Sequence, residues 1–242
     1  MGENWGQSKN SAGKPIDPEH DRGVFTLTPI ADLDKSTPLL AIVLAAGASR
    51  RFGSDKRFAL TPAGTSLIQA TLSALAGHVD AVYIAIRPDD VIDDSWPRSS
   101  SAAATHYVRA PRAEQGMGCS LADAVRQLPP GCDVLVALAD MPFIQSATVG
   151  RLVHHLRHST KSAPIVFPQL AGSMSRGHPV IFHHGYRGEL EALQGDKGAS
   201  GILVVHNDAL DPLEVQDLGV LVDIDQPADL PGLGLSKGLG LS

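Results

Sequence analysis

A short basic segment follows the first strongly apolar stretch of the chain. Residues 39–45 (LLAIVLA) are apolar throughout, and residues 46–56 (AGASRRFGSDK) combine small residues with positive charge. Small residues let backbone N–H groups approach an anion closely, and the Ser49 hydroxyl is a further donor. Arg51 and Lys56 add charged donors suited to phosphate oxygens. The segment predicts a phosphate-binding loop, although a solvated basic turn would have similar composition, and it matches neither GxxxxGK[ST] nor GxGxxG.

A second candidate segment comprises residues 113–121 (AEQGMGCSL). Its glycines and Ser120, placed at the expected start of a helix, offer unpaired N–H donors and room for a flat ligand. An ordinary strand-to-helix turn would have the same spacing. Cys119 lies inside the segment and is interpreted as a small filler.

A single carboxylate follows another mainly apolar stretch. Residues 133–139 (DVLVALA) predict a buried strand, and Asp140 comes directly after it, before Met141 and Pro142. A carboxylate at that position is costly unless it meets a cation or a good donor. Mg²⁺ prefers one or two carboxylates together with substrate phosphates and water. Asp140 is therefore the strongest candidate metal ligand, with a helix cap or loop hydrogen bond as the alternative.

Other polar residues are weaker candidates. Asp223 and Asp225 alternate along a predicted strand and would face the same side. His178 precedes a short predicted strand, and a lone histidine is more often structural. His154 and His158 are four residues apart, but without a third ligand we interpret them as surface residues.

The elements that must position these residues alternate along the chain. Apolar runs predict strands, and segments with helical spacing lie between them. This pattern predicts an α/β fold of three αβα layers around a mostly parallel, Rossmann-like sheet, whose ligands bind beyond the carboxyl ends of the strands. The predicted strands are 39–45, 81–86, 105–109, 133–139, 163–167, 179–182 and 221–224, and the predicted helices are 65–76, 120–128, 146–158 and 186–193.

Composition sets outer limits. The 242 residues carry a net charge of −6, which argues against a nucleic-acid partner but permits a local basic cluster at Arg50, Arg51, Lys56 and Arg57. Two cysteines are too few for a disulfide framework, and no apolar run is long enough to span a membrane, so we expect a cytoplasmic protein. Residues 1–37 and 231–242 are predicted to be flexible extensions of one domain at 38–230.

Taken together, these segments resemble the MobA-like nucleotidyltransferases, most closely the branch of molybdenum-cofactor cytidylyltransferase. The resemblance covers roughly residues 39–230. The sequence departs from the family pattern at three positions. Phe52 stands where the family commonly has Met, and Gln226 stands where it has Thr. Ser200 follows the GDKGA segment, where the family often has Arg. The matching segments are LAAGxSxRFGxxK at 44–56, GMxxSL at 116–121, DMP at 140–142, GHP at 177–179, GDKGA at 195–199 and DIDQPADL at 223–230.

The resemblance implies transfer of a nucleoside monophosphate to a phosphorylated acceptor, with release of pyrophosphate. It makes Arg51, Lys56 and Asp140 catalytic and assigns Mg²⁺, with Mn²⁺ as an alternative, to Asp140 and Asp225, or Asp223 in its place. His178 and Lys197 would bind the acceptor. The implied nucleotide-binding residues are Leu44, Ala45, Ala46, Gly47, Ser49, Arg51, Lys56, Gly116, Met117 and Ser120.

The loop start LAAG favours CTP, because the family pairs LAAG with cytidylyl and LAGG with guanylyl transfer. The implied acceptor is molybdopterin carrying molybdenum, with a molybdoenzyme as a further partner. A sugar, polyol or phospholactate phosphate is an alternative acceptor. A non-catalytic nucleotide-binding cofactor chaperone is an alternative function, and the missing GxGxxG argues against a dinucleotide-dependent oxidoreductase.

Overall fold

The protein is described by a computed structural model, which covers residues 37–49, 52–97 and 103–230. Its sheet has the order β3-β2-β1-β4-β6-β5-β7, and only β6 runs antiparallel to its neighbours. The mostly parallel sheet is therefore confirmed. The strands are β1 (Leu39–Leu44), β2 (Ala81–Ile86), β3 (Ala104–Arg109), β4 (Asp133–Leu138), β5 (Ile165–Leu170), β6 (Val180–Phe182) and β7 (Leu210–Val215).

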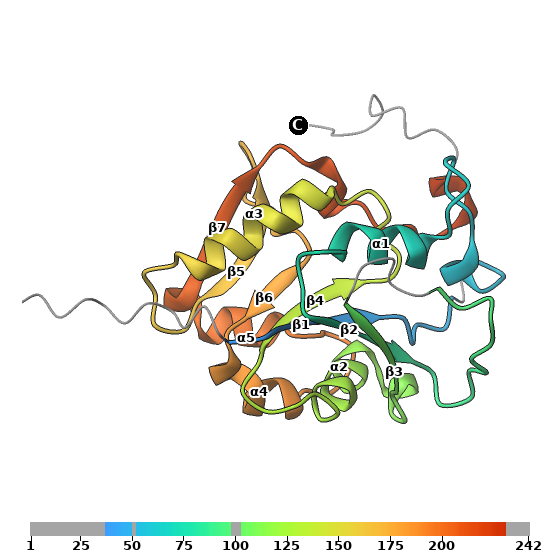
Figure 1. Ribbon diagram of the computed structural model, residues 1–242, viewed down its shortest axis with the longest axis horizontal. Helices are drawn as coiled ribbons and strands as arrows, with labels where there is room; N and C mark the ends of the chain where they lie inside the picture. The colour runs from blue at the N-terminus through green and yellow to red at the C-terminus, as the bar shows by residue number, and fades with distance from the viewer. Residues whose placement is uncertain (1–36, 50–51, 98–102, 231–242) are drawn as a thin grey trace, which may run out of the picture. The chain divides into compact units, whose positions relative to one another are not determined.

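Helices cover both faces of the sheet, which makes three layers (Figure 1). α1 and α3 pack on one face, and α2, α4 and α5 pack on the other, each group over its own apolar core. The alternating side chains of β1 contribute to both cores, as expected of a central strand buried on two sides. The helices are α1 (Leu67–Leu75), α2 (Met117–Val125), α3 (Ser146–Arg157), α4 (Arg187–Glu191) and α5 (Ser200–Val205).

Short 3-10 helices occupy many of the connections. They are η1 (Lys56–Phe58), η2 (Ala113–Gln115), η3 (His184–Tyr186), η4 (Asn207–Ala209), η5 (Leu218–Leu221) and η6 (Pro227–Asp229). Their i→i+3 bonds allow the chain to turn within one or two residues of a strand or helix. η1 places Lys56 directly beside the carboxyl ends of the central strands.

The pairing of β1 with β4 brings two candidate segments together. The strands are parallel, and Leu44, the last residue of β1, lies opposite Leu138, the last residue of β4. The ladder continues one step further, since the Ala139 N–H donates to the Leu44 carbonyl at 3.1 Å. The loop after β1 and Asp140 after β4 therefore emerge at the same edge of the sheet.

Two helix starts illustrate local and tertiary capping. Ser66 caps α1 by accepting from the Gln69 N–H at 3.3 Å, as a residue of its type favours. α3 has no such cap of its own. Asp217, far along the chain, instead accepts from the Gln145 N–H at 2.9 Å and from the Thr148 hydroxyl at 2.7 Å.

Several sequence-based boundaries are wrong. The predicted strand 221–224 is not a strand: η5 ends at Leu221, and the residues after it pair with no strand, although the Ile224 N–H donates to the Asp140 carbonyl just beyond β4. The last strand is β7, which the sequence prediction omitted together with α5. α2 begins at Met117 rather than Ser120, because Gly116 already serves as its N-cap.

The predicted extensions lie almost wholly outside the described residues, which exclude 1–36 and 231–242. Across the described ranges, no helix has the length and apolar character needed to cross a lipid bilayer.

Candidate active site

A cavity of about 850 Å³ opens at the carboxyl edge of the central strands. Its volume lies in the range of small-molecule sites. It gathers the two candidate loops, the candidate metal ligands and the lysine that the sequence analysis selected. Among its lining residues are Leu44, Ala45, Ala46, Gly47, Ser49, Lys56, Gly116, Met117, Ser120, Asp140, Asp223 and Asp225.

The loop after β1 is shaped for close backbone approach. Ser49 has φ of 50°, a left-handed conformation that is uncommon for a serine. Its hydroxyl accepts from the Lys56 N–H at 3.4 Å, and its carbonyl accepts from the Phe52 N–H at 3.0 Å. These bonds tie the two ends of the loop together. Arg51, the other predicted cation, lies outside the described residues.

Lys56 meets both candidate metal ligands at the cavity wall. Its ammonium donates to Asp140 Oδ2 at 2.6 Å, to the Ile224 carbonyl at 3.0 Å and to Asp225 Oδ1 at 3.3 Å. Burial acts to lower the pKa of Lys56, but the hydrogen bonds and charges of Asp140 and Asp225 outweigh it and raise that pKa above its ordinary value. Lys56 therefore stays protonated at neutral pH.

The donor set suits a divalent cation. Asp140 Oδ1 is buried and has no hydrogen-bond partner in the described part of the chain, which is costly for a carboxylate oxygen unless a ligand meets it. Asp223 and Asp225, the residues before and after Ile224, line the same cavity. Hard oxygen atoms of this kind are what Mg²⁺ and Mn²⁺ prefer.

The start of α2 is in contact with the GDKGA segment. The Gly118 N–H donates to the Gly195 carbonyl at 2.8 Å. A Cβ on Gly116, whose φ is +116°, would lie 2.4 Å from that same carbonyl oxygen. Only glycine permits this approach, so Gly116 and Gly118 hold the segment predicted to bind nucleotide against the segment that carries Lys197.

The two candidate acceptor-binding residues lie apart from the cavity lining. His178 is largely buried, its Nδ1 lacks a partner among the described groups, and burial lowers the pKa of its imidazole. The nearby charges of Asp140 and Asp223 act in the opposite direction on that pKa. Lys197 is exposed on the loop that contacts α2.

Arg87 is a cavity residue that the sequence analysis missed. Its guanidinium Nε donates to the Gly47 carbonyl at 3.2 Å, and it lies 3.7 Å from Asp55. Like Asp140, it directly follows a buried strand, here β2, and that position was the available signal. Arg87 places positive charge beside the loop after β1 and donates to a carbonyl of that loop.

Arg57 plays a different part from the one its place in the basic cluster suggested. Its guanidinium is buried, pairs with Asp55 and Asp90, and donates to the Ala45 carbonyl at 3.0 Å. It also stacks over Trp96, with its carbon 4.7 Å from the ring centroid. Arg57 also lines the cavity, but its guanidinium is engaged by these partners and holds the loop after β1 in place.

Two histidine groups lie elsewhere. His154 and His158 stack with ring centroids 4.0 Å apart on α3, and we keep the interpretation of surface residues. Asp133, His183 and His184 gather at the opposite end of β4 from Asp140. Asp133 already pairs with Arg157 at 3.3 Å and accepts from the His184 N–H, so its charge is satisfied within the fold.

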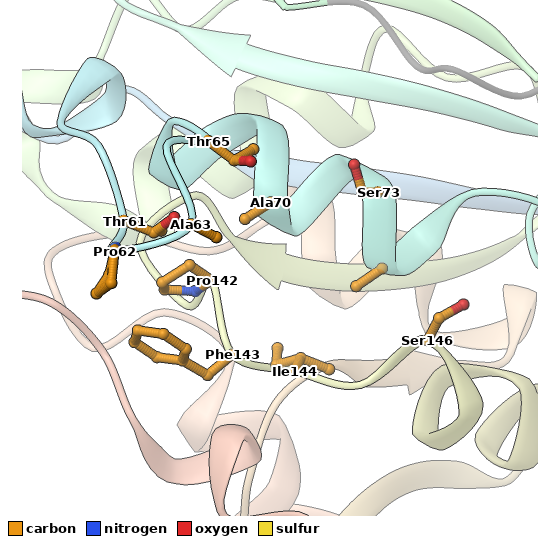
Figure 2. A pocket seen from close by; sticks show the side chains of 11 residues that line it. Thr61, Pro62, Ala63, Thr65, Ala70, Ser73, Pro142, Phe143, Ile144 and Ser146 are labelled. Carbon is orange, nitrogen blue, oxygen red and sulfur yellow. The ribbon is translucent and has the colours of Figure 1, made fainter. Parts of the chain in front are cut away.

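A second cavity, of about 770 Å³, lies between α1 and the loop that follows Asp140. Figure 2 shows Pro142, Phe143 and Ile144 on one side of it and Thr61, Pro62 and Ala63 on the other. None of its lining residues is charged. It is therefore a poor match for a polyphosphate, unlike the cavity around Lys56.

A mostly parallel sheet with a small-residue loop, a lysine and two carboxylates at its carboxyl edge is the arrangement expected of an α/β protein that binds a phosphorylated ligand. Residues 41–239 match the MobA-like NTP transferase domain, and the chain belongs to that family. It is thus a nucleotidyltransferase, as the sequence motifs indicated.

The chain is also similar to individual proteins. The purine catabolism protein PucB of Bacillus subtilis (strain 168) is 29% identical over 204 residues, covering 81% of this chain and 95% of the relative. The crystal structure of Rv0371c from Mycobacterium tuberculosis H37Rv matches with a TM-score of 0.62 and 25% identity, over 80% of this chain and 95% of that one.

Two further structures share the fold. The manganese complex of Rv0371c matches at a TM-score of 0.55 and 23% identity, over 74% of this chain and 88% of that one. Molybdopterin-guanine dinucleotide biosynthesis protein A from Archaeoglobus fulgidus matches with a TM-score of 0.51 and 19% identity, over 79% of this chain and 94% of that one.

Proposed function

We propose that this protein is a cytoplasmic, Mg²⁺-dependent cytidylyltransferase that transfers CMP from CTP to the phosphate of molybdopterin carrying molybdenum. The observation that carries the proposal is the meeting of Lys56, Asp140 and Asp225 opposite the small-residue loop 44–49 in one cavity. Both cysteines are free in the structure, in keeping with a reducing compartment.

The proposed step is a displacement at the α-phosphorus of CTP. An oxygen of the acceptor phosphate forms the new P–O bond, and the bond between the α-phosphorus and the bridging oxygen breaks, so pyrophosphate leaves with that electron pair. The attacking oxygen is already anionic, so no general base is required. Catalysis then depends on alignment and on shielding of negative charge.

The chain's own residues have distinct parts in this step. Backbone N–H groups from Ala45 to Ser49 would cradle the triphosphate, Lys56 and Arg51 would meet the developing charge, and Arg87 would hold the loop in shape. Asp140 and Asp225 would hold the cation. When bound, that cation supplies Lewis-acid stabilisation of the phosphoryl oxygens.

The choice of nucleotide and the choice of acceptor are supported by different observations. CTP is favoured by the LAAG segment at 44–47, which resembles cytidylyl-transferring relatives. The molybdopterin acceptor rests on the resemblance alone, with His178 and Lys197 proposed to face it and a molybdoenzyme proposed to receive the product. The contact of Gly118 with Gly195 supports a single site for both substrates, because it joins their proposed binding segments.

The test is a pyrophosphate-release assay with CTP, GTP, ATP and UTP, with and without a molybdopterin-type acceptor. We expect acceptor-dependent release with CTP and Mg²⁺, and a loss of rate in Lys56→Ala that exceeds its loss of CTP affinity. If pyrophosphate release depends instead on a sugar, polyol or phospholactate phosphate, that compound replaces molybdopterin as the proposed acceptor. Nucleotide binding without any pyrophosphate would favour a cofactor chaperone and defeat the proposal.

A further inference from the structure

The Lys56 ammonium lies in a cage of oxygens that has the composition of a cation site. Its three acceptors are one carboxylate oxygen each from Asp140 and Asp225 and the Ile224 carbonyl, at 2.6, 3.3 and 3.0 Å. Carboxylates and a carbonyl are also the ligands that divalent cations select. The second oxygen of Asp140 is buried beside this cage and lacks a described partner.

We propose that Lys56 and the divalent cation are alternative occupants of this cage. In the nucleotide-free protein, the single positive charge of the ammonium offsets part of the negative charge of the two carboxylates. Cation binding displaces the ammonium, which becomes available to the triphosphate. This inference rests on the proposed function only in taking Asp140 and Asp225 as the cation ligands.

Space and charge oppose simultaneous occupancy of the shared oxygens Asp140 Oδ2 and Asp225 Oδ1. A divalent cation binds carboxylate oxygens at about 2.0–2.6 Å, and the ammonium already lies 2.6 Å from Asp140 Oδ2. Two cations sharing that oxygen would lie close together and repel each other strongly inside a partly buried site. One of them must therefore leave before the other can take its full set of oxygens.

Lys56 can leave without unfolding its surroundings. Its backbone N–H is held by the Ser49 hydroxyl at 3.4 Å, so the start of η1 stays fixed to the loop. The four-carbon stem can then carry the ammonium from the carboxylates toward the cavity lined by that loop. The triphosphate oxygens expected there would offer the ammonium replacement acceptors.

This exchange couples the cation to the nucleotide. Without nucleotide, a cation must compete with the resident ammonium, so its affinity is weakened. With nucleotide bound, the phosphates hold the ammonium, and the cage is open to the cation. Because such coupling is reciprocal, the cation strengthens nucleotide binding by the same factor.

The test measures Mn²⁺ binding to the full chain without nucleotide, by electron paramagnetic resonance of free Mn²⁺. Lys56→Met keeps an apolar stem but removes the charge, and we expect it to bind Mn²⁺ at least tenfold more tightly than wild type. Lys161→Met is the matched control, since the Lys161 ammonium donates to the Asp208 carbonyl at 2.6 Å, outside the cavity lining. Equal or weaker Mn²⁺ binding by Lys56→Met overturns the exchange. So does a gain in Mn²⁺ affinity that persists when Asp140→Asn is added to Lys56→Met, because the gain would then not come from this cage.

A second measurement uses the wild-type protein and so does not depend on the folding of a variant. Amine labelling followed by mass spectrometry reports how accessible Lys56 is, with Lys161 as internal reference. Mn²⁺ should increase Lys56 labelling severalfold and leave Lys161 unchanged; unchanged or reduced Lys56 labelling refutes displacement. Neither measurement includes nucleotide, so both are independent of whether the protein releases pyrophosphate.

Discussion

At the scale of single residues, Asp140 has two oxygens in different situations. Oδ2 accepts from Lys56, while the buried Oδ1 has no described partner. Sequence reasoning could place Asp140 at the sheet edge because it follows a buried strand. It could not show that Lys56, 84 residues earlier, would contact it, since that contact depends on the register of β1 and β4.

Replacing Asp140 by asparagine should remove metal-dependent turnover while leaving the fold intact. The amide has nearly the shape of the carboxylate but carries no charge for a cation, so we expect pyrophosphate release to fall by about 10²-fold or more. Initial rates across a Mg²⁺ titration would measure this. Asp94→Asn, an exposed carboxylate outside the cavity lining, serves as control, and near-normal turnover in Asp140→Asn would remove Asp140 from the metal site.

The predicted roles of other site residues remain proposals. The structure brings the loop 44–49, Met117 and Asp225 to one cavity, in keeping with a sheet whose ligands bind at the carboxyl ends of strands. Arg87 was overlooked because it belongs to none of the motifs that guided the selection. Its contact with Gly47 becomes visible only once β1 and β2 are paired.

At the scale of elements, Arg57 anchors η1 and the loop before it. Burial acts to raise the pKa of Asp55 and Asp90, but the hydrogen bonds and charge of Arg57 outweigh it, so both pKa values lie below their ordinary value. Carboxyl groups with a lowered folded-state pKa contribute stability above the unfolded-state pKa. That contribution is lost as the pH falls through the folded-state value.

Arg57→Met should therefore destabilise the protein at neutral pH and less so in acid. Removing one partner of a buried ion pair costs about 3 kcal/mol, so we expect a loss of that size in urea unfolding at pH 7. The difference from wild type should narrow below about pH 4, where the carboxyl groups become protonated. Arg151→Met, which loses only an exposed bond to the Glu214 carbonyl, should change stability by less than about 0.5 kcal/mol. A pH-independent difference would contradict this account.

The contact between α2 and the GDKGA segment leads to a test with an internal reference. Gly116 and Gly131 both have positive φ, but a Cβ would meet the Gly195 carbonyl only at Gly116 and open space at Gly131. Both alanine variants should carry about 1 kcal/mol or more of backbone strain. Gly116→Ala should lose further stability, and CTP affinity with it, as α2 moves away. Equal unfolding free energies for the two variants would show that the contact is unimportant.

Strands whose sequence is an uninterrupted apolar run could be predicted, whereas a strand with exposed or proline residues could not. The boundaries of β2 agree with the prediction because AVYIAI is an uninterrupted apolar run. β7 (LDPLEV) carries Pro212 and alternating exposed residues, as an edge strand can, so its sequence resembles a loop. The mainly apolar residues 221–224 suggested a strand, but they enter no ladder, and the burial of Ile224 explains why an apolar residue is found there.

At the scale of the whole molecule, Asp217 joins the C-terminal segment to the body of the domain. Its buried carboxylate accepts from the Gln145 N–H, the Thr148 hydroxyl and the Gly219 N–H at 2.7–2.9 Å. The side chain thereby caps α3 and orients η5, which leads to Asp225. Neither end of this connection could be inferred from sequence, because the partners lie about 70 residues apart.

Asp217→Ala should destabilise the protein by about 2 kcal/mol, because it removes a helix cap and leaves buried donors unpaired. It should also weaken Mn²⁺ binding, since Asp225 loses its support. Chemical denaturation and a Mn²⁺ titration would measure the two effects. Asp93→Ala, whose carboxylate makes only local bonds to Ser95, should be near neutral in both. An unchanged Mn²⁺ affinity in Asp217→Ala would disconnect the C-terminal segment from the site.

The bond from the Ile224 N–H to the Asp140 carbonyl, at 2.9 Å, has a consequence for how the protein matures. The ribosome finishes β1, β2, β3 and β4 long before it reaches residue 225. A nascent chain could therefore form the proposed phosphate-binding loop before Asp225, the second carboxylate of the proposed cation site, has been synthesised. Translation itself would then withhold catalytic competence until the sheet that supports it has been made.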